Sequence, residues 1–204
     1  MPRIIFWNIK ARDLCKELKF LCAEYDPEML ILAESSIEDS IILQSINAGH
    51  SGIFYADINI SQRIKIYSRY GMERLKLIRD DEYFSIRKLV PYLGPSLLIV
   101  AAHLPSKLHA TPLDQFTAAQ RLSAAIREAE DSGGEKNTVV IGDFNMSPFE
   151  DGMVGASALH ATLDRKIARK QTRIVKKESY PFFLQSDVGT ARRFDSWPTW
   201  NSSL

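Results

Sequence analysis

The sequence predicts a layered domain of mixed strands and helices, of the α/β or α+β class, with its helices on the outside. Short apolar runs of strand length recur along the chain, and amphipathic segments with helical spacing lie between them. Some neighbouring strands follow each other directly, which favours a sheet that is not purely parallel. The chain has 204 residues, 45% of them hydrophobic, enough for one large domain with its own core.

The N-terminal half alternates strand and helix patterns. Apolar residues at helical spacing follow the first strand, and Pro27 ends that helix. The expected elements are, in order, a strand at 3–7, a helix from about Leu14 to Tyr25, a buried strand at 29–33, a helix at 40–48, and adjacent strands at 51–57 and 63–68.

The C-terminal half contains the most apolar run, which predicts a buried strand at 97–102 after the turn at Gly94. A helix is expected over 114–129, because its apolar residues share one face and a Gly pair ends it. A further buried strand is expected at 138–141 and a helix at 159–168. Beyond residue 186 the sequence has little periodicity.

Composition excludes several classes of protein. The formal net charge of +1 argues against a strongly basic nucleic-acid coat protein and an acidic disordered tail. Cys15 and Cys22 are too few for a disulfide scaffold, and no nearby histidines complete a tetrahedral zinc site with them. The sequence has no secretory signal and no apolar run of membrane-spanning length, so we expect a cytoplasmic protein with no membrane partner.

Polar residues with chemical capability end four of the predicted buried strands. These are Asn8, Glu34, His103 and Asp143, with Asn145 two residues further on. If the strand ends meet at one rim, the side chains share a pocket. Oxygen ligands of this kind suit Mg²⁺, which binds one or two protein carboxylates and keeps several waters. Phosphoester hydrolysis is the reaction that such a set serves.

Each of these residues also has an ordinary structural interpretation. Asn8 and the Asp143–Asn145 segment are typical of turns, and Glu34 suits a helix start. His103 alone is more often a hydrogen-bonded core histidine. The other three histidines, His50, His109 and His160, belong to no motif and are expected at the surface.

Together, the motifs resemble the endonuclease/exonuclease/phosphatase superfamily of DNase I-like proteins. The resemblance covers roughly residues 3 to 150 in the family's order. It is carried by Trp7-Asn8, Leu32-Ala33-Glu34, Ile64 to Arg69, Ala102-His103-Leu104 and, most specifically, Ile141 to Pro148. It implies an α+β fold, a four-layer α/β/β/α sandwich lacking the final strands. The implied function is Mg²⁺-dependent phosphodiester hydrolysis, with Mn²⁺ as the alternative ion and nucleic acid as the favoured substrate.

The resemblance also implies a role for each site residue. Asn8 and Glu34 would bind the metal, with Glu34 as the main ligand. His103, Asp143 and Asn145 would be catalytic: His103 on the leaving-group or phosphate side, Asp143 orienting water or binding metal, and Asn145 holding the phosphate. The substrate-binding residues are not indicated.

The family's C-terminal Asp-His pair is absent, since no histidine follows His160 and Asp187 precedes Val188. We therefore expect one domain over 1–204 that is truncated or divergent after about residue 186. The cause would be a natural truncation, an artificially chosen end of the chain or a disrupted reading frame. Missing strands would leave an open sheet edge, which a second copy or a partner chain would cover. The alternative function is an inactive family member that binds phosphate-containing ligands or a protein.

A run of seven cations without an acid lies between residues 165 and 177. At helical spacing most of them would share one face, and the plain interpretation is a solvated surface. The functional interpretation is a surface that contacts phosphates near the rim of the active site.

Overall fold

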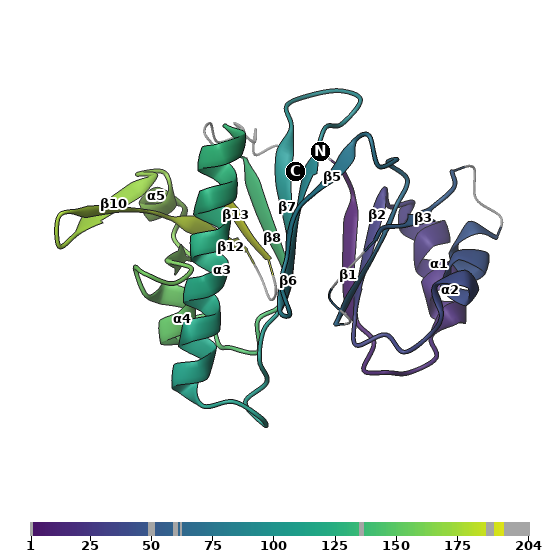
Figure 1. Ribbon diagram of the computed structural model, residues 1–204, viewed down its shortest axis with the longest axis horizontal. Helices are drawn as coiled ribbons and strands as arrows, with labels where there is room; N and C mark the ends of the chain where they lie inside the picture. The colour runs from purple at the N-terminus through teal and green to yellow at the C-terminus, as the bar shows by residue number, and fades with distance from the viewer. Residues whose placement is uncertain are drawn as a thin grey trace.

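The structure is a computed structural model that describes residues 2–48, 52–58, 61, 63–134, 137–186 and 190–193. In it, two sheets pack face to face between helices (Figure 1). The helices are α1 (Cys15–Tyr25), α2 (Asp39–Asn47), α3 (Pro112–Gly133), α4 (Asp151–Val154) and α5 (Arg165–Ala168). The strands are β1 (Ile4–Asn8), β2 (Met29–Ala33), β3 (Tyr55–Ala56), β4 (Ile64–Ser68), β5 (Leu75–Asp80), β6 (Phe84–Leu89), β7 (Leu97–His103), β8 (Thr138–Asp143), β9 (Ala161–Thr162), β10 (Thr172–Val175), β11 (Glu178–Pro181), β12 (Phe183–Ser186) and β13 (Thr190–Arg193).

The first sheet has the order β1-β2-β4-β3, and the second has the order β5-β6-β7-β8-β13-β12-β9. Within them β1 runs parallel to β2, and β7 runs parallel to β8. Helices α1 and α2 cover the outer face of the first sheet, while α3 and α4 cover that of the second (Figure 1). The expected four-layer DNase I-like sandwich is therefore confirmed.

Central strands explain the continuous apolar runs in the sequence. In β7, Ile99 and Ala101 face the first sheet, whereas Val100 and Ala102 face α3. In β2, Met29 and Ile31 face the second sheet, whereas Leu30 and Leu32 face α1 and α2. Successive side chains on a strand point to opposite faces, so a strand between two covered faces is apolar throughout.

Helix α3 begins at a capping box. The Thr111 hydroxyl accepts a hydrogen bond from the Asp114 N–H, and the Asp114 carboxylate accepts one from the Thr111 N–H. Pro112 occupies the first turn, where its missing N–H leaves no helical bond unmade. The helix expected over 114–129 is confirmed and is longer at both ends.

Three expectations for the later chain are wrong. The helix predicted at 159–168 is confined to α5, because Ala161–Thr162 pairs as a strand with β12. The cations at 165–177 do not share a helical face, since the chain turns after α5 into the hairpin β10–β11. His160 is also not at the surface: it is buried and stacks on Phe182.

Other expectations concern residues that the structure does not describe or describes only in part. His50 and residue 51 lie outside the described residues, and so does most of the chain beyond Ser186. Of that last stretch the structure describes β13, which pairs with β8. Within the described chain, β1 and the short β3 are the edges of the first sheet. None of the described helices has the length and apolarity needed to cross a bilayer.

Candidate active site

The four polar strand ends meet at one rim of the sandwich. Asn8 ends β1 and Glu34 follows β2, so the parallel pairing of these strands brings both residues to the same sheet edge. His103 and Asp143 end the parallel strands β7 and β8 and are register partners. Because the two sheets pack face to face, the two pairs face each other.

Asn8 joins the two sheets. Its Nδ2 donates to Glu34 Oε1 at 2.9 Å and to Asp143 Oδ2 at 3.1 Å. Its Oδ1 accepts from the Lys10 N–H at 3.0 Å, which fixes the orientation of the amide. One side chain thereby holds the two carboxylates on opposite sides of its donor group.

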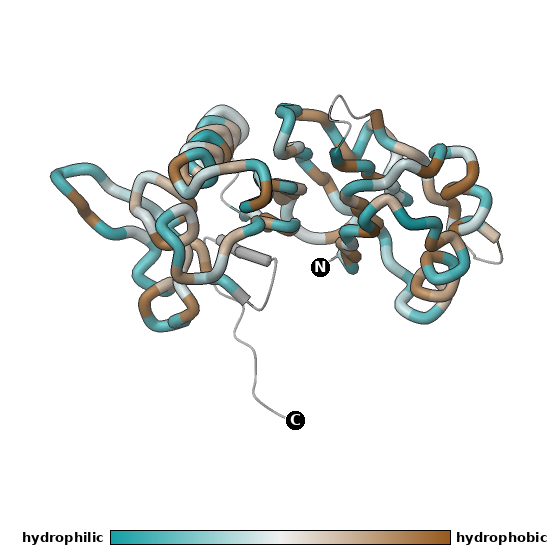
Figure 2. The backbone as a smooth tube through the Cα atoms, turned by 90° about the horizontal axis from the view of Figure 1, so that it is seen from below, coloured by the Kyte–Doolittle hydropathy of each residue, from teal (hydrophilic) through white to brown (hydrophobic). Residues whose placement is uncertain are grey.

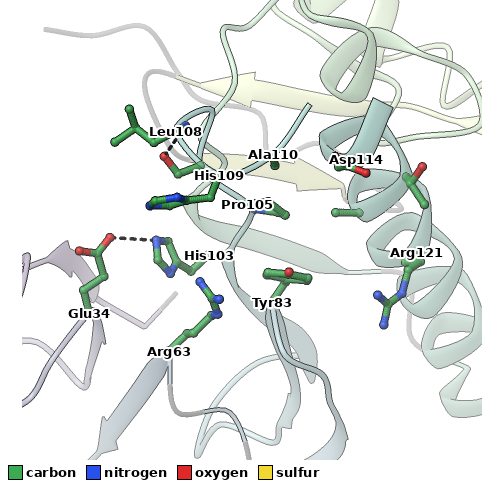
Figure 3. Close-up of a pocket in the computed structure, with 13 residues that line it drawn as sticks. Glu34, Arg63, Tyr83, His103, Pro105, Leu108, His109, Ala110, Asp114 and Arg121 are labelled. Atoms are coloured by element: carbon green, nitrogen blue, oxygen red, sulfur yellow. Dashed lines mark hydrogen bonds and ion pairs between the residues drawn. The ribbon is translucent and has the colours of Figure 1, made fainter. Parts of the chain in front are cut away.

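His103 contacts the same carboxylate oxygen. Its Nε2 lies 3.1 Å from Glu34 Oε1, and the residue is only 5% exposed (Figure 3). The backbone N–H of His103 donates to the Tyr83 carbonyl at 2.8 Å, which fixes the strand position from which the ring projects. Among the described residues, Nδ1 is buried without a hydrogen-bond partner. Because Nδ1 has no partner among these residues and Nε2 lies beside a carboxylate oxygen, the His103 ring donates to Glu34 through Nε2.

The Glu34 carboxylate keeps one oxygen open. Both contacts with Asn8 and His103 use Oε1, and no described residue hydrogen-bonds to Oε2. The side chain is 42% exposed and lines the cleft. The backbone at Glu34 has a φ of 52°, in the left-handed region that costs a non-glycine residue about 1 kcal/mol. Strain of this kind is typical of functional sites.

The loop after β8 is held by hydrogen bonds from both directions. The Asn145 N–H donates to Asp143 Oδ1 at 3.0 Å, and its Nδ2 donates to the Leu104 carbonyl at 2.9 Å. Asn145 also has a φ of 52°. Gly142 allows β8 to approach β7, since a Cβ there would lie 1.9 Å from the Ala102 carbonyl oxygen. These contacts place the Asp143 carboxylate beside Asn8.

Gln115 is a positioning residue that the sequence pattern did not indicate. Its Nε2 donates to the carbonyls of Pro105 and Asn145, at 2.9 and 2.8 Å, and it is 2% exposed. It therefore ties the loop after β7 to the loop after β8. The available signal was a polar side chain on the buried face of α3.

A cleft of about 770 Å³ extends from Glu34 and His103 toward α3 (Figure 3). Arg63 and Tyr83 line it next to Glu34 and His103, since their carbonyls accept from the backbone N–H groups of these two residues, and Arg121 lines it from α3; His109 lines it as well. The Arg63 guanidinium lies over the Tyr83 ring, 5.2 Å from its centroid. Burial raises the pKa of the Tyr83 phenol above its usual value.

Carboxylates from one turn orient both arginines. Arg63 Nη2 pairs with Glu82 at 3.2 Å, and Arg121 Nη2 pairs with Asp81 at 2.8 Å. Each guanidinium has five N–H donors, so the remaining donors are available to an anion in the cleft. None of these residues stood out in the sequence, because their proximity depends on packing: Arg63 precedes β4 in the first sheet, whereas Arg121 lies on α3 against the second.

The residues of the site fit a hard divalent cation. Glu34 Oε2 is free of hydrogen bonds from described residues, and Asp143 supplies a second carboxylate on the other side of Asn8, whose amide turns its nitrogen toward both. No cluster of three or more His, Cys, Asp or Glu side chains arranged for a metal occurs in the described part of the chain. Mg²⁺ does not need one, since one or two carboxylates and several waters suffice.

Comparisons with known proteins support the fold. No protein-family model matches the sequence, and no curated protein matches it. Among solved structures, the zebrafish TDP2 complex with a single-stranded DNA product is 19% identical, with a TM-score of 0.53. The human Nocturnin catalytic domain is 16% identical with a TM-score of 0.54, and Staphylococcus aureus beta toxin with bound magnesium ions is 12% identical with a TM-score of 0.54.

These matches cover 74%, 76% and 74% of this chain, and 64%, 70% and 68% of the respective structures. All three structures belong to the DNase I-like superfamily. At these identities the similarity establishes the fold that the sequence motifs implied.

Proposed function

We propose that this chain is a divalent-metal-dependent phosphodiester hydrolase that acts on nucleic acid. The observation that carries the proposal is the hydrogen-bonded set at the strand ends. Asn8 bridges Glu34 and Asp143, and His103 contacts the same Glu34 oxygen. Four residues spread over more than a hundred positions thus bring carboxylate, amide and imidazole groups to one rim, where Glu34 and His103 line the cleft and Asp143 lines a neighbouring pocket.

Glu34 would hold the metal through its open Oε2, and Asn8 would join it through Oδ1, which keeps a second lone pair beside the bond from the Lys10 N–H. A bound Mg²⁺ would stabilise negative charge on the phosphoryl oxygens, and Mn²⁺ would serve as well. The beta toxin structure contains bound magnesium ions, which agrees with this assignment.

The other three residues act on the substrate. Asp143 orients the attacking water, because its carboxylate is held by Asn8 and by the Asn145 N–H. His103 donates a hydrogen bond to the phosphate or leaving group in place of its bond to Glu34. Asn145 was expected to hold the phosphate, but its Nδ2 donates to the Leu104 carbonyl, so we assign it the role of fixing the loop beside the phosphate. In-line attack by water on phosphorus then releases an alcohol and a phosphomonoester.

Nucleic acid suits the shape and chemistry of the cleft. Arg63 lies beside the Glu34–His103 pair and the cleft continues past it to Arg121 on α3, so the two arginines are placed to contact a second phosphate on the same strand. A substrate with one phosphate would leave that part of the cleft empty. The single-stranded DNA product in the TDP2 structure is a ligand of the same class.

Plasmid nicking tests the proposal. The wild-type chain should nick supercoiled DNA with Mg²⁺ and lose this activity in EDTA. Glu34→Gln should lose it as well, by about 10² or more, because a charged oxygen at the metal becomes a neutral amide. Glu38→Gln is the matched control, since Glu38 is exposed and lies outside the cleft.

The second candidate is a phosphate-binding protein without catalysis, motivated by the missing Asp-His pair. A folded wild-type chain that binds DNA but does not nick it would establish this function instead. Loss of one acid–base group typically lowers a rate by 10² to 10⁴, so the nicking assay needs that sensitivity.

A further inference from the structure

A strongly charged surface of the described structure lies outside the cleft. We call residues 165–181 the basic arm, which comprises α5, β10, the turn after it and β11. Seven cations and one acid give the arm a formal charge of +6, and since the whole chain carries +1, the remaining residues together carry −5. The cations are Arg165, Lys166, Arg169, Lys170, Arg173, Lys176 and Lys177. All seven are exposed.

The cations of the basic arm have no ion-pair partner among the described residues. Outside the arm, most of the described arginines form an ion pair with a carboxylate, as Arg79 does with Glu128 at 2.8 Å. The one acid of the arm, Glu178, accepts a hydrogen bond from the Tyr180 hydroxyl. The charge of the arm is therefore not neutralised within the described structure.

The hairpin tip places two lysines in an unfavourable backbone conformation. Val175 pairs with Glu178, so Lys176 and Lys177 form a two-residue turn. Their φ values are 49° and 72°, as in the type I′ turn, where Asn and Gly are strongly preferred. Lysine offers no conformational advantage at these positions, which indicates that the charge at the tip serves another purpose.

The base of the arm is fixed to the body of the protein. His160 stacks on Phe182 with centroids 4.1 Å apart, and its Nδ1 lies 3.1 Å from the Pro181 carbonyl oxygen. Arg127 of α3 lies 5.9 Å from the centroid of Tyr180. The hairpin projects sideways from the α3 end of the molecule, away from the sheet rim that carries the site (Figure 1). Figure 2, at right angles, shows the same projection.

We infer that the basic arm binds the sugar–phosphate backbone of a nucleic acid beyond the segment that occupies the cleft. An array of exposed, unpaired cations suits a polyanion with regularly spaced phosphates. Because the arm points away from the cleft, it reaches only a long substrate. The choice of nucleic acid as the partner rests on the proposed function.

An acidic membrane is less suited to this surface. Arms that bind membranes combine cations with exposed Trp, Phe or Leu side chains that enter the bilayer. On the hairpin, Ile174 is the large apolar residue with a mostly exposed side chain, at 75%. The turn itself has only lysines.

The test is the salt dependence of binding, measured by fluorescence anisotropy with a labelled 30-nucleotide duplex in EDTA. The variant Lys176→Gln/Lys177→Gln should make the slope of log K against log salt less steep by about 2. The matched control Lys16→Gln/Lys19→Gln removes the same charge from exposed positions of α1 and should keep the wild-type slope. Lys176→Arg/Lys177→Arg should keep it too, which separates charge from hairpin folding.

Equal slopes for the arm variant and the control would overturn the inference. So would an unchanged slope together with lost binding to phosphatidylserine vesicles, which would assign the arm to a membrane. A trinucleotide that fills only the cleft should bind both variants equally. Because EDTA prevents metal-dependent cleavage, failure here is distinguishable from failure of the proposed function, which the nicking assay reports.

Discussion

The Asn8 side chain donates a hydrogen bond to Asp143 at 3.1 Å, across the two sheets and across 135 positions of sequence. The same nitrogen donates to Glu34. A neutral amide thus lies between two carboxylates that would otherwise repel each other at the rim of the sandwich. The geometry of the site therefore depends on how the two sheets pack. In turn, the stability of that packing depends on the charges of the side chains that Asn8 joins.

Replacing Asn8 with aspartate tests this link. Asn8→Asp removes the donor and brings a third carboxylate against Glu34 and Asp143, which should destabilise the metal-free protein by about 1–3 kcal/mol. Mg²⁺ should restore much of this stability, because it neutralises the added charge. Thermal unfolding in EDTA and in Mg²⁺ measures both effects. The same unfolding temperature as the wild type in both conditions would contradict the link.

The arginines of the cleft wall should affect substrate binding more than chemistry. Arg63→Gln and Arg121→Gln should each raise the KM for an oligonucleotide about tenfold, the scale of one charged contact, and leave kcat nearly unchanged. Hydrolysis of bis(p-nitrophenyl) phosphate, which has one phosphate, should be unaffected.

Arg79→Gln is the control for these variants. Arg79 is also paired with a carboxylate and about half exposed, but it lies outside the cleft. A KM change of equal size in the control, or an equal effect on the small substrate, would show that Arg63 and Arg121 do not contact a second phosphate.

A buried ion pair joins β6 to β5 and to the segment after β3. The Arg87 guanidinium is fully buried and pairs with Asp80 at 2.8 Å and with Asp57. Arg87→Met should destabilise the fold by about 3–5 kcal/mol, because it leaves buried carboxylates without their cation. Chemical denaturation measures the change. A loss below about 1 kcal/mol would mean that these carboxylates are neutral or reach water.

The capping box of α3 should make stability depend on pH. Hydrogen bonds from the Thr111 side chain and backbone lower the pKa of Asp114 below that of an unfolded aspartate. Stability from this carboxylate is therefore present above the unfolded pKa and is lost as pH falls through the folded pKa.

Asp114→Ala should accordingly unfold at a lower temperature than the wild type at neutral pH, and the difference should shrink below about pH 4. Melting curves across this range give the comparison. A difference that stays constant into acid would mean that the carboxylate charge contributes nothing to the cap.

The sequence predicted the parts of the fold that depend on local pattern. The runs of β2 and β7 are apolar on both faces, and their polar ends marked Glu34 and His103. In contrast, β6 was not predicted because Arg87 interrupts its apolar pattern, and only distant carboxylates make that arginine compatible with burial. The hairpin of the basic arm was mistaken for a helical face because cation spacing does not distinguish the two.

The residues of the site could likewise be predicted only where they follow a local pattern. Asn8, Glu34, His103, Asp143 and Asn145 could be selected because each follows a recognisable strand, and the structure brings them together. Gln115 and Arg121 lie on α3 and reach the site only through the packing of that helix. No local pattern distinguishes them from other polar helix residues.

The most direct test of the central claim is Mn²⁺-induced broadening of the backbone amide signals in NMR spectra. If Asn8, Glu34, His103 and Asp143 surround one divalent-metal site, low Mn²⁺ should broaden their signals together. Glu34→Gln should abolish the effect, and Glu38→Gln should preserve it. Broadening centred elsewhere, or broadening that persists in Glu34→Gln, would contradict the account.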